Sequence, residues 1–345
     1  MTDPSIIYDA VIVVSFGGPE RPDDVMPFLE NVTRGRDVPR ERLLEVEKNY
    51  ELFGGVSPIN EQNRRLVAAL QTVLRQQGPD LPVYFGNRNW DPYLADTLRQ
   101  MADDGVERAL AFVTSAYSSY SGCRQYLENI EQARAAVGAR APVIEKLRAF
   151  WNHPGFIVPM AEAVDGALAA IPAERRSDAR LVYTAHSLPL GLARTSDYEL
   201  QLRDACGLVA LRLSQEISWD LVYQSRSGPP TQPWLEPDIL DHLTALAEEG
   251  VRDVVNLPIG FISDHMEVVF DLDTQARQRA SELGIEFARV PTVGTHPAFV
   301  QMIRDLIVER IEPLSARRAL GNLGPRPMPC APDCCPPPQR HRPGG

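Results

Sequence analysis

Eight short apolar runs rich in β-branched residues recur along the chain, and segments with helical periodicity separate most of them. Strands that alternate with helices predict an α/β fold with doubly wound parallel sheets. The later strand intervals match between the two halves, which indicates two similar domains. The apolar runs lie at 9–18, 82–89, 108–122, 142–147, 179–189, 219–230, 251–265 and 285–290, and helical periodicity is clearest at 93–101, 160–170 and 239–247.

The length of 345 residues suits two domains of roughly 150 residues each. We expect a first domain at 6–149 and a second at 150–317, whose last helix packs back on the first. Beyond residue 318 the apolar periodicity stops, and eight of the last 25 residues are proline. Residues 318–345 are therefore expected to form a cysteine-bearing tail.

Composition excludes several classes of function. The formal net charge of -11 argues against nucleic acid or an anionic membrane as the main partner. The longest early apolar run is Val11–Val14, so neither a signal peptide nor a spanning helix is expected. The odd count of five cysteines argues against a disulfide framework. We expect a cytoplasmic protein without stable membrane insertion. No G-x-G-x-x-G opens a helix after a strand, which weighs against a dehydrogenase.

Polar loops follow directly after the predicted strands. In open parallel sheets, ligands bind beyond the carboxyl ends of the strands. These loops are therefore the expected place of a functional site. Their sequences are SFGGPE (15–20), TSAYSSYSG (114–122), TAHSLP (184–189), QSRSGPP (224–230) and GFISDH (260–265).

The stretch FISDHMEVVFDLD (261–273) holds four carboxylates and an imidazole, which are costly to bury together. Glu267 and Asp271 are four residues apart and so share one helical face. His186 ends a strand of the same half. The simple interpretations are a histidine held by backbone hydrogen bonds and an acidic residue near a helix N-terminus. The functional interpretation is a site over the sheet for a divalent metal such as Fe(II).

Two further groups of residues stand out. The stretch 33–42 carries four arginines and is either a solvated loop or a binding site for ligand carboxylates. The tail spacing C-x3-C-C suits zinc or a [2Fe–2S] centre, and each needs four ligands. Cys123 lies in a strand-end loop within reach of the tail, whereas Cys206 sits in a helical run as a small buried hydrophobe. The alternative is a disordered tail with incidental or zinc-binding thiols. The three tail cysteines are Cys330, Cys334 and Cys335.

Taken together, the motifs resemble the ferrochelatase family, which inserts Fe(II) into a porphyrin in haem synthesis. The resemblance covers about residues 8–315 and rests on SFGGPE, FGGVSPIN, TSAYSSYSGC, TAHSLP, QSRSGPP with PWLEPD, and GFISDHMEVVFDLD in that order. It implies two Rossmann-like chelatase domains with a porphyrin cleft between them. It makes His186 and Glu267 the catalytic pair, with Asp271 as a further metal-binding residue. The implied porphyrin-binding residues are Ser57, Tyr126, Phe16 and Tyr50.

The motifs NVTRGR and NRNW and the cysteine-bearing tail resemble those of the family members from high-GC Gram-positive bacteria. That resemblance implies coproporphyrin III as the substrate and Fe-coproporphyrin III as the product. Four propionates need more cationic partners than two, and the arginine-rich stretch 33–42 is a candidate source. The resemblance also implies a [2Fe–2S] cluster bound by one internal and three C-terminal cysteines. The implied ligands are Cys123, Cys330, Cys334 and Cys335.

The chain departs from the family pattern at four positions. Phe16 stands where some relatives have a tyrosine that ligates the porphyrin iron. Thr33 and Asn49 stand where some relatives have arginines for the propionates. Gln275 ends the acidic row one turn beyond Asp271. These departures concern the axial contact, the propionate partners and the outer metal path.

The implied chemistry explains the acidic stretch. A free-base porphyrin holds two N–H protons, and the metal enters only as they leave. An imidazole and a carboxylate serve as proton acceptor and metal ligand, and the sequence leaves open which does which. The expected partners are porphyrin and Fe(II). The protein is expected to be a monomer that makes transient contact with neighbouring haem-pathway enzymes. The alternatives are a protoporphyrin IX ferrochelatase, a cobalt or nickel chelatase of the same fold, and a non-catalytic tetrapyrrole or iron carrier.

Overall fold

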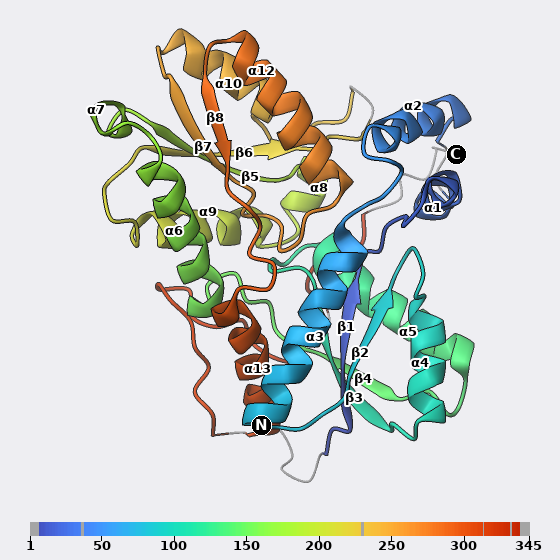
Figure 1. Ribbon diagram of the computed structural model, residues 1–345. Coiled ribbons are helices and arrows are strands. Elements are labelled where there is room, and N and C mark those ends of the chain that lie inside the picture. Colours follow the sequence, from blue (N-terminus) through green and yellow to red (C-terminus); the bar gives the residue numbers. More distant parts are fainter. Residues whose placement is uncertain (1–6, 36–37, 229–230, 313, 332, 339–345) are drawn as a thin grey trace.

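Two four-stranded parallel sheets form the framework of the structure, which is a computed structural model (Figure 1). The first sheet has the order β2-β1-β3-β4 and the second the order β6-β5-β7-β8, so the second repeats the topology of the first. This confirms the predicted α/β fold with two similar units. The strands are β1 (Ala10–Ser15), β2 (Val83–Asn87), β3 (Arg108–Val113), β4 (Val143–Lys146), β5 (Arg180–His186), β6 (Trp219–Gln224), β7 (Asp253–Leu257) and β8 (Glu286–Arg289).

The structure describes residues 7–35, 38–228, 231–312, 314–331 and 333–338. Arg36, Pro229 and Pro230 of the sequence motifs lie outside the described residues, as do residue 6 and residues 339–345 of the expected domain limits. The helices are η1 (Pro22–Asp24), α1 (Val25–Val32), α2 (Arg40–Glu51), α3 (Ile59–Gln77), α4 (Leu94–Asp103), η2 (Tyr120–Arg124), α5 (Gln125–Val137), α6 (Pro154–Ala169), α7 (Ala173–Arg176), α8 (Leu190–Ala193), α9 (Tyr198–Ala210), α10 (Ile239–Glu248), α11 (Met266–Val268), η3 (Val269–Ala276), α12 (Arg277–Glu282) and α13 (Pro297–Ile311).

Each sheet is covered by helices on both faces, which explains why its strands read as continuous apolar runs. All six side chains of β1, AVIVVS, are buried. Alternate residues of β1 and β3 pack on α4 and α5 on one face and on α3 on the other. The second sheet packs on α10, η3 and α12 on one face and on α6 and α9 on the other. Every strand falls inside one of the eight predicted runs.

One hydrophobic core is shared by the two sheets. It contains Val13 of β1, Tyr183 of β5 and Phe299 of α13, each essentially without solvent exposure. Helix α13 lies against both α3 and α6, so the last helix contacts elements that flank different sheets (Figure 1). This packing fixes the position of one sheet relative to the other.

Helices α1 and α2 form a lip beyond the carboxyl ends of the first sheet. Their apolar faces make a small buried cluster that includes Phe28 and Tyr50. Met266 of α11 belongs to the same cluster, so the lip touches the segment that carries the acidic row. No helix in the described part of the chain has the length and apolar character needed to cross a bilayer.

A buried ion pair joins α13 to the segment between the sheets. The Nε and Nη2 atoms of Arg148 donate to the Glu309 carboxylate at 2.7 and 2.8 Å, and both side chains are at least 95% buried. Arg148 Nη2 also donates to the Arg318 carbonyl at 2.8 Å, and Nη1 to the Ala149 carbonyl at 3.3 Å. The carboxylate and the two carbonyls together accept four hydrogen bonds from the guanidinium, and the bond to the Arg318 carbonyl anchors the start of the C-terminal tail.

Replacement of Glu309 by glutamine should destabilise the protein strongly, because it leaves the Arg148 charge buried without a counter-charge. The expected loss is about 3–5 kcal/mol in the free energy of unfolding, measured by denaturant titration. The control is Glu199→Gln, which breaks an exposed Arg203–Glu199 pair on α9 and should change the stability by less than about 1 kcal/mol. Equal effects of the two substitutions would contradict this view of the buried pair.

Candidate active site

Loops at the carboxyl ends of the two sheets meet directly. The Tyr117 hydroxyl, after β3, donates to the Ile259 carbonyl, after β7, at 2.9 Å. Gln62 of α3 makes two hydrogen bonds with Asp264: its Oε1 accepts the Asp264 N–H at 2.8 Å, and its Nε2 donates to the carboxylate at 3.3 Å. The segment that precedes Glu267 is thereby fixed against the first sheet.

His186 and Glu267 form a pair in this region. His186 ends β5, and its Nδ1 donates to the Ser187 carbonyl, which leaves Nε2 facing Glu267 Oε2 at 3.5 Å. Glu267 lies in the first turn of α11, whose N-terminus is capped by His265 Nδ1, the acceptor of the Glu267 N–H at 3.2 Å. The side chains of His186 and Glu267 are 32% and 52% exposed, so a ligand can reach both.

The two members of the pair shift each other's pKa in opposite directions. Burial alone would lower the pKa of His186, but the nearby Glu267 carboxylate outweighs it and raises the pKa to about 9. Burial alone would raise the pKa of Glu267, but the His186 charge lowers it to about 2. At neutral pH the free protein therefore holds an imidazolium against a carboxylate. Burial lowers the pKa of the neighbouring His265, which stays neutral.

Asp271 lies on the π-helix η3, one turn beyond Glu267. A π-helix is wider than an α-helix and is often found at functional sites. The Asp271 carboxylate accepts a short hydrogen bond from the Ser225 hydroxyl and one at 3.3 Å from Gln224 Nε2. Gln224 Nε2 also donates to the Glu267 carbonyl at 3.0 Å. Burial and the Glu267 charge raise the pKa of Asp271 to about 7, against the opposing effect of the Ser225 and Gln224 hydrogen bonds.

The other two carboxylates of the acidic stretch are neutralised within the protein. Arg289, at the end of β8, binds Asp273 through Nε and Nη2 at 2.6 and 2.8 Å and Asp264 through Nη1 at 3.1 Å. No arginine of the described residues forms an ion pair with Glu267 or Asp271, the other two carboxylates of 261–273. The four acidic side chains therefore divide into a pair bound by Arg289 and a pair on the side of His186.

A row of aromatic side chains runs from the end of β1 into the buried cluster of the lip. Phe16, which follows β1, is 37% exposed and makes an edge contact with Phe28 at 6.3 Å between ring centroids. Phe28 makes the same kind of contact with Tyr50. Tyr50 is 8% exposed, and burial and the Glu267 charge raise its pKa. The row from Phe16 to Tyr50 therefore ends beside the catalytic pair expected from the sequence.

Two expected porphyrin-binding residues are covered in the structure. Ser57 is 3% exposed, and its N–H donates to the Pro19 carbonyl at 2.8 Å. Tyr126, at the start of α5, is 5% exposed and lies beneath the Arg88 guanidinium, 4.4 Å from the ring centroid. Tyr50 is buried as well, so Phe16 is the one of the four expected porphyrin-binding residues whose side chain is exposed, and a ligand above Tyr126 meets Arg88 first.

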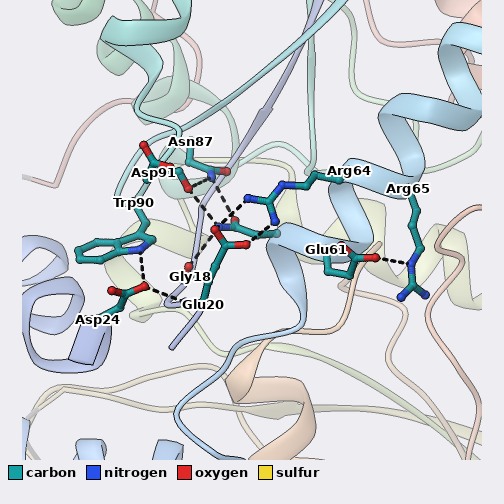
Figure 2. A network of polar contacts seen from close by, with 10 residues as sticks. Gly18, Glu20, Asp24, Glu61, Arg64, Arg65, Asn87, Trp90 and Asp91 are labelled. Atoms are coloured by element: carbon teal, nitrogen blue, oxygen red, sulfur yellow. Dashed lines mark hydrogen bonds and ion pairs between the residues drawn. The ribbon is translucent and has the colours of Figure 1, made fainter. Parts of the chain in front are cut away.

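A polar network fixes the loops that follow β1 and β2 (Figure 2). Asn60 Nδ2 donates to the carbonyls of Gly18 and Asp91, both at 3.1 Å, and Asn60 Oδ1 accepts from Asn87 at 3.1 Å. Trp90 Nε1 donates to Asp24 at 3.3 Å (Figure 2). A side chain at position 17 would meet Asn87 at 2.9 Å, and φ there is +85°, so the loop requires glycine.

The arginine-rich stretch is largely paired with its own surroundings. Arg40 contacts Glu30 at 3.3 Å and Arg42 contacts Glu45 at 2.7 Å, both pairs on the exposed surface. The Thr33 hydroxyl donates to the Leu29 carbonyl at 2.7 Å, Asn49 is half-buried on α2, and Gln275 is exposed on η3.

The structure brings together the four cysteines that the sequence singled out. The Cys123 thiol, on the π-helix η2, is hydrogen-bonded to the thiols of Cys330 and Cys335, and Cys335 contacts Cys334. These hydrogen bonds lower the pKa of Cys123. Cys206 lies apart, fully buried in the shared core. Among the described residues, no three His, Cys, Asp or Glu side chains are arranged to hold a single metal ion.

Sequence reasoning did not assign roles to Gln224, Ser225, Gln62 and Arg88. Gln224 and Ser225 lie in the quoted motif QSRSGPP, whose position after a strand was the available signal. Arg88 lies in the quoted motif NRNW. Gln62 gave no signal, because its contact with Asp264 joins residues 202 positions apart.

The fold and site define a protein with two parallel-sheet units whose carboxyl edges meet beside an imidazole–carboxylate pair. The structure titled "SirB from Bacillus subtilis with Fe3+" shares this fold, with a TM-score of 0.53, 10% identity, and coverage of 87% of this chain and 96% of that chain. The family model Ferrochelatase matches residues 8–311, so the chain belongs to the ferrochelatase family.

Two similar proteins cover nearly the whole chain. A ferrochelatase of Rhodopirellula baltica is 58% identical over 95% of this chain and 93% of its own length. A coproporphyrin III ferrochelatase of Nocardia farcinica is 52% identical over 96% of this chain and 97% of its own length. The resemblance drawn from the motifs is thereby confirmed at the level of the family.

His186 and His265 should titrate on opposite sides of the ordinary histidine pKa of about 6.5. His186 should lose its proton near pH 9 because Glu267 stabilises the imidazolium, and His265 should lose its proton below pH 6.5. Histidine NMR titration measures both, with resonances assigned from single alanine variants. In Glu267→Gln the His186 pKa should fall, because the largest contribution that raises it is lost while burial remains. A His186 pKa that is unchanged in Glu267→Gln would contradict the pairing.

Proposed function

We propose that this protein inserts Fe(II) into coproporphyrin III to give Fe-coproporphyrin III in haem biosynthesis. The observation that carries the proposal is the His186–Glu267 pair, which lies where the carboxyl edges of the two sheets meet in a member of the ferrochelatase family. Relatives that share about half of their residues with this chain carry the name coproporphyrin III ferrochelatase. Porphyrin and Fe(II) are the substrates in this proposal.

The charge state of the pair supports a division of labour. In the free protein Glu267 is ionised and His186 Nε2 is protonated, so Glu267 is the group ready to accept a porphyrin N–H proton. Release of the His186 Nε2 proton to the Asp271 carboxylate, and from there to solvent, then frees the Nε2 lone pair for the incoming metal. Glu267 is the proposed proton acceptor, and His186 the proposed metal-side ligand.

Asp271 is the proposed next group outward. Its pKa of about 7 lets it take up a proton from Glu267 and release it to solvent near neutral pH, or hold the hydrated cation when ionised. Gln224 bridges Asp271 and the Glu267 carbonyl, so it fixes the distance between the two carboxylates. We propose positioning roles for Gln224 and Ser225.

The proposed organisation keeps the limits expected from the sequence: domains at 6–149 and 150–317 and a tail at 318–345. The contact of α13 with both α3 and α6 supports the return of the last helix of the second domain to the first. The proposed location is the cytoplasm, in line with the odd number of cysteines and the acidic composition.

We propose a [2Fe–2S] cluster bound by Cys123, Cys330, Cys334 and Cys335. The four thiols are linked by hydrogen bonds, and cations lie around them: Lys146 contacts Cys123, Arg326 contacts Cys330, and Arg124 donates to the Cys334 carbonyl at 2.9 Å. A two-iron centre spreads its thiolates over two metals, so it does not need the tight arrangement that one ion requires. When bound, such a centre supplies one-electron exchange.

The cluster proposal is tested on anaerobically purified protein. We expect reddish protein with sulfide-to-iron charge-transfer bands and about two irons per chain. Cys123→Ser should lose the bands and the iron, whereas the matched control Cys206→Ser should keep both, because Cys206 lies in the apolar core. A colourless protein, or one that holds only zinc, would refute the cluster.

The function is tested by anaerobic mixing of the protein with Fe(II) and coproporphyrin III, followed by absorbance. We expect metallation, with kcat/KM well above that for protoporphyrin IX. His186→Ala should abolish turnover while porphyrin binding persists, and Glu267→Gln should lower turnover by about a hundredfold or more. The control is His242→Ala on α10, remote from the cleft, which should leave turnover unchanged.

Near-normal turnover in both His186→Ala and Glu267→Gln would remove the proposed site. A preference for protoporphyrin IX would overturn the substrate assignment, and faster insertion of Co(II) or Ni(II) than of Fe(II) would overturn the metal assignment.

A further inference from the structure

Arg88 lies at the carboxyl edge of the first sheet. It follows β2 directly, and its guanidinium lies over the Tyr126 ring at 4.4 Å and 5.7 Å from the centroid of Phe16. Phe16 begins the aromatic row that reaches Tyr50 and the Glu267 charge. Arg88 therefore adjoins the exposed end of the aromatic row, whose buried end lies beside the proposed catalytic pair.

Two hydrogen bonds hold the Arg88 guanidinium without neutralising it. Nε donates to Asn129 Oδ1 at 2.7 Å, and Nη1 donates to the Ser121 carbonyl at 3.3 Å. Both acceptors are uncharged, and no carboxylate of the described residues forms an ion pair with Arg88. By contrast, the nearby Arg64 is bound by Glu20 through both of its terminal nitrogens. Arg88 thus keeps its charge and its Nη2 donors available.

The loop that carries Arg88 is rigid. Asn87 is fully buried and binds Asn60 and the Asp91 carbonyl, each at 3.1 Å (Figure 2). The Arg88 N–H donates to the Ser15 carbonyl at 2.9 Å. A guanidinium held by stacking, by two hydrogen bonds and by a fixed backbone is preorganised for a carboxylate, so less entropy is lost on binding.

We propose that Arg88 binds a propionate carboxylate of the porphyrin. This inference rests on the proposed function, because it names a contact of the same substrate in the same cleft. Thr33 and Asn49 leave two propionate positions without the arginines that some relatives have there, and Arg40 and Arg42 are occupied by Glu30 and Glu45. Arg88 supplies a charge that these positions lack.

The test compares Arg88→Gln, Arg88→Lys and the control Arg65→Gln, which removes an exposed arginine of α3 that is paired with Glu61. Binding of coproporphyrin III is followed by porphyrin fluorescence without iron. We expect Arg88→Gln to weaken binding by about tenfold or more, the scale of a lost charge-assisted hydrogen bond. Arg88→Lys should be intermediate, because it keeps the charge and loses the planar fork. Arg65→Gln should bind as the wild type does.

Two further readouts separate a carboxylate contact from a structural effect. The tetramethyl ester of coproporphyrin III, dissolved with detergent, should bind wild type and Arg88→Gln equally. At saturating porphyrin, kcat of Arg88→Gln should match that of the wild type, because Arg88 acts in binding and not in proton or metal transfer.

Equal affinity of wild type and Arg88→Gln for coproporphyrin III would overturn the inference, and so would an equal loss for the acid and its ester. If the wild type binds the porphyrin and does not metallate it, the proposed function fails while the binding comparison still decides the role of Arg88.

Discussion

The contact between the two carboxyl edges is the constraint on which the rest of the site depends. The bond from Tyr117 to the Ile259 carbonyl and the paired bonds between Gln62 and Asp264 place the start of α11 against the first sheet. His186, at the end of β5, and Glu267, in α11, come together only because β5 and β7 are neighbours and their loops leave on the same edge. The shared core and the Arg148–Glu309 pair keep the two sheets in this relation.

The acidic stretch is stable because each carboxylate has a different means of compensation. Arg289 neutralises Asp264 and Asp273 and ties both to β8. Glu267 is balanced by an imidazolium, and Asp271 by two neutral donors and a raised pKa. The compensation of the first pair is permanent, whereas that of the second pair depends on protons. Proton-dependent compensation is what a reaction that removes two protons from its substrate requires.

Much of this could be predicted from the sequence, since β-branched runs fix the parallel strands and the carboxyl edge fixes the place of the site. The gathering of Cys123 with the tail thiols followed from ligand number and a strand-end loop. Details that depend on packing between distant residues could not be predicted. The π form of η3, the burial of Tyr126 beneath Arg88 and the partners of Asp264 all arise from contacts that one local sequence does not encode.

One short element connects the two polar features on the first sheet. The π-helix η2 carries Cys123 toward the tail thiols, and the carbonyl of its Ser121 holds the Arg88 guanidinium at the rim of the cleft. The contact of the tail thiols with Cys123 and the position of the Arg88 guanidinium therefore both depend on the five residues of η2.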